Sequence, residues 1–300
     1  MKSGNPINLR SETINIRGKL IDLSIPRIMG ILNVTPDSFY DGDKFMTENS
    51  ILNQVEKMLA EGASFIDVGG YSSRPDAVDI PEKEEISRSV NAVKLIAKKF
   101  PAAILSIDTF RSEVARQAVL DGASMINDIS AGELDEKMFT TVAQLKVPYV
   151  IMHMRGTPQT MKTLTEYENI IKEITNYFHQ KILVLHALGV HDIIIDPGFG
   201  FAKTIEQNFQ LLSHLDHFKI LGKPILAGLS RKSMIWKTLG TSPAGALNGT
   251  TAVNMTALLK GATILRVHDV KEAVEVIKLF TNIQDGNQLP VTGNWQPVTI

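Results

Sequence analysis

The sequence contains no cysteine among its 300 residues. This absence excludes disulfide bonds, thiolate metal sites and cysteine nucleophiles, and it suits a reducing compartment. The chain also has no excess of one charge, because its formal net charge is −1 and the two signs are interspersed. We therefore expect neither a nucleic acid nor an acidic membrane surface as its partner.

Other common features are missing as well. No apolar run approaches the ~20 residues of a membrane span, and the polar residues 1–19 contain no apolar core of a signal peptide. We accordingly expect a cytoplasmic protein with no membrane partner. No G-x-G-x-x-G motif follows the first apolar run, which argues against a dinucleotide fold. No His-Glu-x-x-His motif or other paired-histidine spacing indicates zinc.

What the chain does have is a repeated apolar run that ends in a polar residue. Ile193, Ile194 and Ile195 are β-branched and apolar on both faces, so they predict a strand covered on both sides, as in a parallel sheet. The run ends at Asp196, and a Pro-Gly turn follows. The chain contains eight runs of this kind, at residues 28–33, 64–69, 103–108, 124–128, 149–153, 192–196, 224–229 and 263–268.

Stretches of helical periodicity separate these runs. They include residues 51–61, 83–99, 113–120, 167–188 and 205–215. Eight strand–helix units in about 250 residues predict an α/β protein of the (β/α)₈ TIM-barrel type rather than a doubly wound sheet. Apolar and polar residues alternate over 13–23, which predicts a short β-hairpin before the barrel. We therefore expect an N-terminal extension and hairpin at 1–27, a catalytic barrel at 28–284 and a C-terminal tail at 285–300.

The residues at the strand ends predict the site, because barrel enzymes place their chemistry at the C-terminal ends of the strands. The residues at or just beyond these ends are Asn33, Asp67, Asp108, Asn127, Met152, Asp196, Lys232, Arg266 and His268. Arg266 and His268 are two residues apart, so on a strand they project to the same face. They follow the loop 230–233, a Ser-rich stretch flanked by Lys and Arg that opens a predicted helix. This combination predicts a phosphate site.

The acidic strand ends belong to a different part of the ring. Asp67, Asp108 and Asp196 would repel one another unless a metal, a cation or a ligand with several N–H donors neutralised them. A polar heterocycle with paired N–H groups would match such carboxylates, and Asn127 can both donate and accept. Oxygen ligands suit Mg²⁺ held by Asn33 and a ligand phosphate. From these residues alone, we expect a barrel enzyme that binds an anionic group beside a polar heterocycle.

A set of longer motifs adds a resemblance. The segments Met29-Gly30-Ile31-Leu32-Asn33-Val34-Thr35-Pro36-Asp37-Ser38-Phe39, Asp67-Val68-Gly69-Gly70, Ser73-Arg74-Pro75, Ser106-Ile107-Asp108-Thr109, Ile126-Asn127-Asp128, Met152-His153-Met154, Asp196-Pro197-Gly198-Phe199-Gly200-Phe201, Ser230-Arg231-Lys232-Ser233 and Arg266-Val267-His268-Asp269 occur in this order. Together they resemble the signatures of the dihydropteroate synthase family, and the match runs from about residue 14 to 280. The resemblance implies a transferase of folate biosynthesis that joins 6-hydroxymethyl-7,8-dihydropterin diphosphate to p-aminobenzoate and releases diphosphate. It also implies Mg²⁺ as cofactor, a homodimer and sensitivity to sulfonamides.

The same resemblance assigns roles to individual residues. Those expected to act in catalysis are Asp37, Asp108, Asp196 and Lys232. The expected pterin pocket consists of Asp67, Asp108, Asn127, Met152, Asp196, Gly228 and Lys232. The expected diphosphate site consists of Asn33, Arg74, Arg266 and His268, with Asn33 also binding the metal. The expected p-aminobenzoate site consists of Ser73, Arg74, Pro75, Phe201, Lys232 and Ser233. The implied mechanism is S_N1-like: diphosphate leaves, and the arylamine attacks a pterin methylene cation.

The chain departs from the family pattern in two places. Tyr71-Ser72-Ser73-Arg74 stands where Glu-Ser-Thr-Arg is usual, and Ala202 stands where glycine is common. The first change lies beside the expected p-aminobenzoate site, so it bears on arylamine and sulfonamide affinity. Two alternatives are a pterin-binding barrel of the corrinoid methyltransferase type and a non-catalytic pterin-binding subunit. An assay for diphosphate release that depends on both substrates separates the three.

Overall fold

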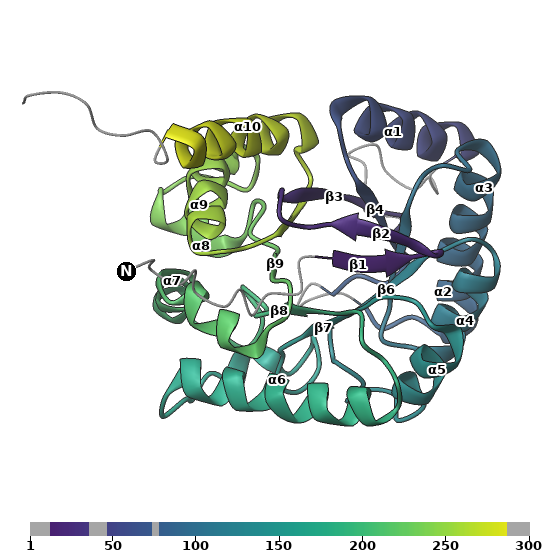
Figure 1. Cartoon of the computed structure of the whole chain (residues 1–300), viewed down its shortest axis with the longest axis horizontal. Helices are drawn as coiled ribbons and strands as arrows, with labels where there is room; N and C mark the ends of the chain where they lie inside the picture. Colours follow the sequence, from purple (N-terminus) through teal and green to yellow (C-terminus); the bar gives the residue numbers. More distant parts are fainter. Residues whose placement is uncertain (1–12, 36–46, 74–77, 287–300) are drawn as a thin grey trace, which may run out of the picture.

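A computed structural model describes residues 13–35, 47–73 and 78–286 of the chain (Figure 1). Its main sheet has eight parallel strands in the order β8-β7-β6-β5-β4-β3-β10-β9, which confirms the predicted barrel. The ring closes where Ile195 of β8 meets Ile225, just before β9, in an isolated parallel bridge. The strands are β3 (Arg27–Asn33), β4 (Phe65–Gly69), β5 (Leu105–Asp108), β6 (Met125–Asp128), β7 (Tyr149–Met152), β8 (Ile193–Asp196), β9 (Leu226–Ala227) and β10 (Ile264–Val267).

Helices form an outer layer around this ring (Figure 1). They are α1 (Glu48–Glu61), α2 (Glu82–Glu85), α3 (Asn91–Lys99), α4 (Ser112–Leu120), α5 (Met138–Leu145), α6 (Ile170–Ala187), α7 (Ile205–Ser213), α8 (Ser233–Thr238), α9 (Leu247–Leu259) and α10 (Val270–Gly286). Every second strand residue faces the helices and joins their apolar sides in one large buried cluster. Among the described residues, no helix is both long and apolar enough to cross a bilayer. The predicted C-terminal tail beyond residue 286 lies outside the described residues.

Two predicted helices differ in their bounds. The sequence predicts one continuous helix over 83–99, whereas α2 and α3 are separated by a π-helical turn, Ile86–Val90. This wider turn accompanies a buried Glu85, whose carboxylate bonds outside its own helix. The helix predicted over 167–188 begins only at Ile170, because the side chain of Asn169 accepts a hydrogen bond from the Lys172 amide and caps it.

The lower interior of the barrel is apolar. This layer consists of one residue from each of seven strands, namely Met29, Phe65, Met125, Val150, Ile194, Leu226 and Ile264, and of Ile104, which directly precedes β5. Three side chains from the N-terminal segment, Ile14, Ile16 and Leu23, pack into the same cluster and are at most 3% exposed. Together they make a dry floor at the end of the barrel where the strands begin.

The predicted hairpin supplies two of these three side chains. β1 (Thr13–Ile16) and β2 (Lys19–Asp22) pair antiparallel, with Ile14 opposite Ile21. Arg17 and Gly18 both have positive φ angles, 52° and 79°, as a two-residue type I′ turn requires. The hairpin lies across the middle of the ring of strands (Figure 1). It therefore closes one end of the barrel and leaves chemistry to the other.

Candidate active site

The interior becomes polar only two residues further along the same strands. This second layer consists of Ile31, Asp67, Ser106, Asn127, Met152, Asp196, Gly228 and Arg266. Asn33 and Asp108 follow another two residues along their strands, at the C-terminal end. The structure thus brings the predicted polar strand ends together above the apolar floor. Burial among protein atoms makes each of these charges expensive unless it has a partner.

Arg266 is the partner of two of the carboxylates. Its Nε atom donates to Oδ2 of Asp67 at 2.6 Å, and its Nη2 atom donates to Oδ2 of Asp108 at 2.5 Å. Nδ2 of Asn127 donates to the same Asp67 oxygen at 2.9 Å. The second Asp67 oxygen, Oδ1, is buried and has no hydrogen-bond partner among the described residues. An acceptor of this kind is satisfied when a ligand presents an N–H group to it.

One guanidinium cannot neutralise both carboxylates. Burial raises the pKa of Asp108 to about 7, Arg266 opposes the rise, and the neighbouring Asp67 adds to it. The two acids share one cation. The cluster can therefore accept a further positive charge or several N–H donors from a ligand.

Asp196 and Lys232 form the other side of the same cavity. Oδ1 of Asp196 accepts a hydrogen bond from the Gly198 amide at 2.8 Å. A Cβ atom on Gly228 would lie 3.8 Å from both Oδ2 of Asp196 and Nζ of Lys232, so glycine leaves this space open. Burial raises the pKa of the Asp196 carboxyl. Burial lowers the pKa of Lys232 to about 8, although the Asp196 charge acts in the opposite direction.

Lys232 also connects the cavity to the loop that follows β8. Its ammonium lies 4.9 Å from the ring centroid of Phe201 and donates to the carbonyl oxygen of Phe199. The Phe201 ring packs beside a buried apolar cluster formed by Ile129, Met152, Met154, Met161 and Ala202. A flat aromatic ligand could pack against the Phe201 ring while its polar end meets Lys232.

Sequence reasoning missed the residue that supports this loop. Lys203 is 9% exposed, and its Nζ donates to the carbonyl oxygens of Gly198 and Phe201, each at 2.9 Å. The same Nζ lies 3.1 Å from Nδ1 of His153. Burial lowers the pKa of both side chains. His153 is thus a structural residue, and Lys203 holds the backbone on which Phe201 stands.

The predicted phosphate site is found in part. Ser230 and His268 lie together, with the Ser230 Oγ accepting from the His268 amide at 3.2 Å and lying 3.0 Å from its Nδ1. Arg231, expected to flank this site with positive charge, forms a partly buried ion pair. Its Nε and Nη2 donate to the Asp269 carboxylate at 2.9 and 2.8 Å.

The predicted metal ligand lies next to these groups. A Cβ atom on Gly69 would lie 3.7 Å from Oδ1 of Asn33 and 3.6 Å from Oδ2 of Asp108, so both oxygens border the same small space. Across the described ranges, no group of three or more His, Cys, Asp or Glu side chains could hold a metal. The two oxygens that border this space suit an ion that takes one or two protein oxygens and is otherwise held by ligand phosphates and water, as Mg²⁺ is.

The remaining predicted site residues fall in two groups. Ser73 and Ser233 are described, and Ser233 begins α8 directly after Lys232. Asp37, Arg74 and Pro75 lie outside the described residues.

Comparisons with known proteins agree with this geometry. Residues 29–268 match the family model of pterin-binding enzymes. The dihydropteroate synthase of Haemophilus influenzae is 42% identical over 264 residues, which cover 87% of this chain and 95% of that protein. The enzyme of the same name from a Synechocystis strain is 44% identical over 255 residues, covering 84% of this chain and 88% of that protein.

Solved structures give the same result. The structure of Yersinia pestis dihydropteroate synthase in a sulfonamide drug complex matches with a TM-score of 0.86 at 37% identity, covering 91% of this chain and 99% of that chain. Xanthomonas albilineans dihydropteroate synthase with 4-aminobenzoic acid matches with a TM-score of 0.85 at 37% identity, covering 93% of this chain and 100% of that chain. The Xanthomonas enzyme has also been solved with 7,8-dihydropteroate, and that chain matches with a TM-score of 0.82.

Proposed function

The chain belongs to the dihydropteroate synthases, and from that membership we propose how its residues divide the work of the reaction. The enzyme is a transferase that joins 6-hydroxymethyl-7,8-dihydropterin diphosphate to p-aminobenzoate, giving 7,8-dihydropteroate and diphosphate. The observation that carries the division is the acidic cluster around Arg266, with its unpartnered Asp67 Oδ1.

The pterin ring occupies the space bordered by the second interior layer. Its N–H donors meet Asp67 and Asp196, and Asn127 supplies both a donor and an acceptor. Met152 packs against the ring, and Gly228 leaves room for it. Bound in this way, the ring provides the donors that a carboxylate cluster with one guanidinium lacks.

The diphosphate lies above the ring, toward the C-terminal ends of β3 and β10. Arg266 and His268 bind its oxygens, and Arg74 is the third basic residue of this site. Mg²⁺, held by Asn33 and the phosphate oxygens, would neutralise charge on the leaving group. The single protein oxygen assigned to the ion agrees with the preference of Mg²⁺ for phosphates and water.

p-Aminobenzoate binds between the loops after β4, β8 and β9. Phe201 packs on its ring, Lys232 and Ser233 meet its polar end, and Ser73 lies on the opposite side. Arg74 and Pro75 complete the proposed subsite. Lys232 contacts both substrates, which explains its place between Asp196 and Phe201.

The chemistry follows from these positions. When the bond between the pterin methylene carbon and diphosphate oxygen breaks, both bonding electrons leave with diphosphate, and the carbon gains positive charge. Asp108 and Asp196 stabilise that charge, because fixed carboxylates in a site with little water need no reorganisation. The amine nitrogen of p-aminobenzoate then donates its lone pair to the carbon. The new nitrogen centre releases a proton to solvent, and 7,8-dihydropteroate results.

Diphosphate release in the presence of both substrates tests the function. A corrinoid-dependent methyl carrier or a non-catalytic pterin-binding subunit would release none.

The Asp196→Asn variant tests the proposed pterin site. The substitution turns one acceptor that faces the ring N–H groups into a donor. Pterin affinity should fall by ~1–3 kcal/mol, the usual cost of an unsatisfied buried polar group.

Asp216→Asn is the matched control for this variant. Asp216 is half exposed and pairs with Lys260 on the outside of the barrel. The Asp216→Asn variant should have the pterin affinity of the wild type. Unchanged affinity in a folded Asp196→Asn enzyme would mean that the ring lies elsewhere.

We also propose that the enzyme is a homodimer and that it works in the cytoplasm. Exposed apolar side chains on the adjoining helices α9 and α10, such as Leu259, Leu279 and Ile283, support self-association. Sedimentation equilibrium at micromolar concentration tests the dimer, since a single species of monomer mass would contradict it.

A further inference from the structure

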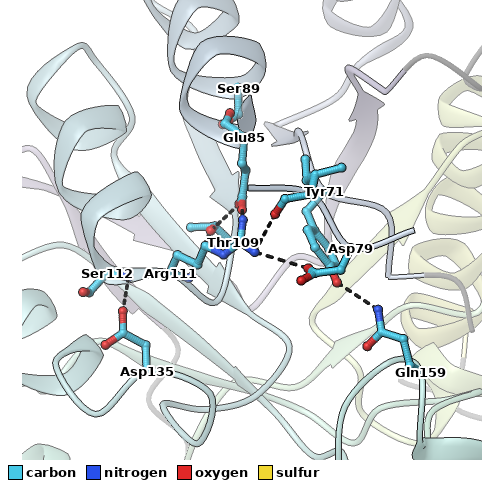
Figure 2. A network of polar contacts seen from close by, with 10 residues as sticks. Tyr71, Asp79, Glu85, Ser89, Thr109, Arg111, Ser112, Asp135 and Gln159 are labelled. Carbon is cyan, nitrogen blue, oxygen red and sulfur yellow. Dashed lines mark hydrogen bonds and ion pairs between the residues drawn. The ribbon is translucent and has the colours of Figure 1, made fainter. Parts of the chain in front are cut away.

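A hydrogen bond joins two loops across the mouth of the barrel. Tyr71 follows β4, and its hydroxyl accepts a hydrogen bond from Nε2 of Gln159, in the loop after β7, at 3.0 Å (Figure 2). The two residues are 88 positions apart, and β5 and β6 lie between their strands in the sheet. Tyr71 is 9% exposed, so its ring is packed and its hydroxyl is the polar end of a buried side chain.

Arg111 fixes the other side of the loop that begins at Tyr71. Its Nη2 donates to the carbonyl oxygen of Ile80 at 2.8 Å and lies 3.3 Å from Oδ1 of Asp79 (Figure 2). Its guanidinium carbon is 5.4 Å from the centroid of the Tyr71 ring. A single side chain therefore contacts residues on both sides of the segment that carries the proposed arylamine-binding Ser73.

A buried acid holds Arg111 in this position. Nη1 of Arg111 donates to Oε2 of Glu85 at 2.8 Å, and the other Glu85 oxygen accepts from Oγ1 of Thr109 at 2.5 Å. Glu85 is fully buried, so the ion pair is shielded from salt and from competing water, unlike the exposed Asp79. Glu85 thus fixes the guanidinium, which in turn contacts Tyr71 before residue 74 and Asp79 and Ile80 after residue 77.

An aromatic contact leads from this network to the proposed p-aminobenzoate site. The rings of Tyr71 and Phe110 meet edge to face, with centroids 5.0 Å apart at 85°. Phe110 packs against the same buried apolar cluster as Phe201, the ring assigned to the arylamine. Arg111 also lies over the Phe110 ring, at 5.2 Å from its centroid. A shift of Tyr71 would therefore reach Phe110 and the cluster that it shares with Phe201.

We propose that Tyr71, Gln159 and Arg111 form a positioning clasp that sets the affinity for the arylamine substrate. The proposal rests on the site division given above and adds three residues that contact neither substrate. We expect its effect to be specific, because the hydrogen bonds described for the three residues hold the loops after β4, β5 and β7 and do not involve the Asp67–Arg266–Asp108 cluster. Losing it should weaken arylamine binding and leave pterin binding and the chemical step nearly intact.

Three variants test the clasp by steady-state kinetics with each substrate varied in turn. Tyr71→Phe keeps the ring and removes the acceptor, and Gln159→Leu removes the donor. Each should raise KM for p-aminobenzoate about fivefold to tenfold, with kcat and the KM for pterin diphosphate changed less than twofold. The double variant should be no worse than either single one, because both remove the same bond. Arg111→Lys, which keeps the charge but not the planar fork, should show the same split.

Two surface residues provide matched controls. Gln117→Leu and Arg116→Lys change the same side-chain types on the outer face of α4, where both residues pair with Glu113. They should have wild-type constants, and melting temperatures should show that all variants are folded. Wild-type KM for p-aminobenzoate in the clasp variants would overturn the inference, as would equal losses for the two substrates.

The experiment also separates this inference from the site assignment. If Phe201→Ala has a wild-type KM for p-aminobenzoate, the proposed arylamine site is wrong and the clasp falls with it. If Phe201→Ala is impaired while Tyr71→Phe is not, the arylamine site stands and only the clasp is wrong.

Discussion

Arg266 shows how one side chain can hold a polar site together. It bonds both Asp67 and Asp108, and removing it would leave two buried carboxylates facing each other. In the proposed complex, the Arg266 guanidinium binds the diphosphate. The pterin N–H groups then take its place as hydrogen-bond donors to the two carboxylates. The residue therefore links the pterin and phosphate subsites through a single change of partners.

The raised pKa of Asp108 gives a prediction about pH. Below its pKa of about 7 the carboxyl is protonated, so it no longer stabilises positive charge, and kcat/KM for pterin diphosphate should fall. The folded pKa lies above the ordinary value of 3.8, so the folded state holds a proton that the unfolded state has lost. The contribution of the Asp108 carboxyl to the free energy of unfolding should therefore decrease as pH rises from the ordinary pKa of 3.8 to the folded pKa of about 7.

Asp108→Asn checks both statements, because the amide does not titrate in this range. The variant should lose the acidic limb of the pH–rate profile near neutrality, beyond its general loss of rate. If the acidic limb of the pH–rate profile stays at the same pH in Asp108→Asn, another enzyme group or the substrate causes it.

Lys203 gives a second prediction at this scale. Lys203→Met keeps much of the volume but leaves the carbonyl oxygens of Gly198 and Phe201 without this donor. The free energy of unfolding should fall by ~1–3 kcal/mol. KM for p-aminobenzoate should rise, since Phe201 stands on that backbone. Chemical denaturation and kinetics measure the two effects, and Lys172→Met on the exposed face of α6 serves as control. A variant with wild-type stability would show that water replaces the ammonium.

At the scale of elements, mutations can test whether the hairpin β1–β2 stabilises the fold by closing the lower end of the barrel. Ile16→Ala removes a side chain that is 3% exposed from the barrel floor, which should cost ~2–5 kcal/mol of unfolding free energy. Leu20→Ala in the same hairpin is the control, because Leu20 is 70% exposed. Neither change should alter KM for the two substrates. A changed KM in the Ile16 variant would mean that floor and site are coupled.

The elements differ in how far the sequence could predict them. The eight strands were predictable because a strand covered on both faces is a continuous apolar run between turn residues. The π-helical turn Ile86–Val90 was not, since it depends on Glu85 reaching Thr109 and Arg111, which lie beyond a different strand. The partner of Arg231 could not be predicted for the same reason, because Asp269 is 38 residues away. Contacts between loops leave no periodic trace in a sequence.

At the scale of the whole molecule, the interior divides into two layers with separate tasks. The apolar floor stabilises the fold, and the polar layer above it carries the chemistry. The polar strand ends were visible in the sequence because each ends an apolar run. Lys203 and Gln159 were not assigned roles, because their positions become meaningful only when the loops are folded over the barrel.

The ring of strands has a weak point. β9 is two residues long and meets β8 through the isolated bridge Ile195–Ile225, whereas β3 and β4 pair over five register positions. Amide hydrogen exchange should therefore be faster in residues 225–229 than in β3 and β4. Saturation with a pterin should slow it, because Asp196 and Gly228 border the pocket from the two sides of this junction. Equal protection of both strand pairs in the ligand-free protein would contradict this prediction.

This junction has a pharmacological consequence. A small molecule seated between Asp196 and Gly228 would tie together the two strands with the sparsest backbone pairing, so part of its binding energy would appear as resistance of the whole protein to unfolding. An inhibitor directed at the pterin pocket would then slow turnover of the enzyme by proteases while it blocks the reaction. Cells treated with such an inhibitor would accumulate the inhibited enzyme. The inhibitor concentration would then have to exceed the rising concentration of the enzyme.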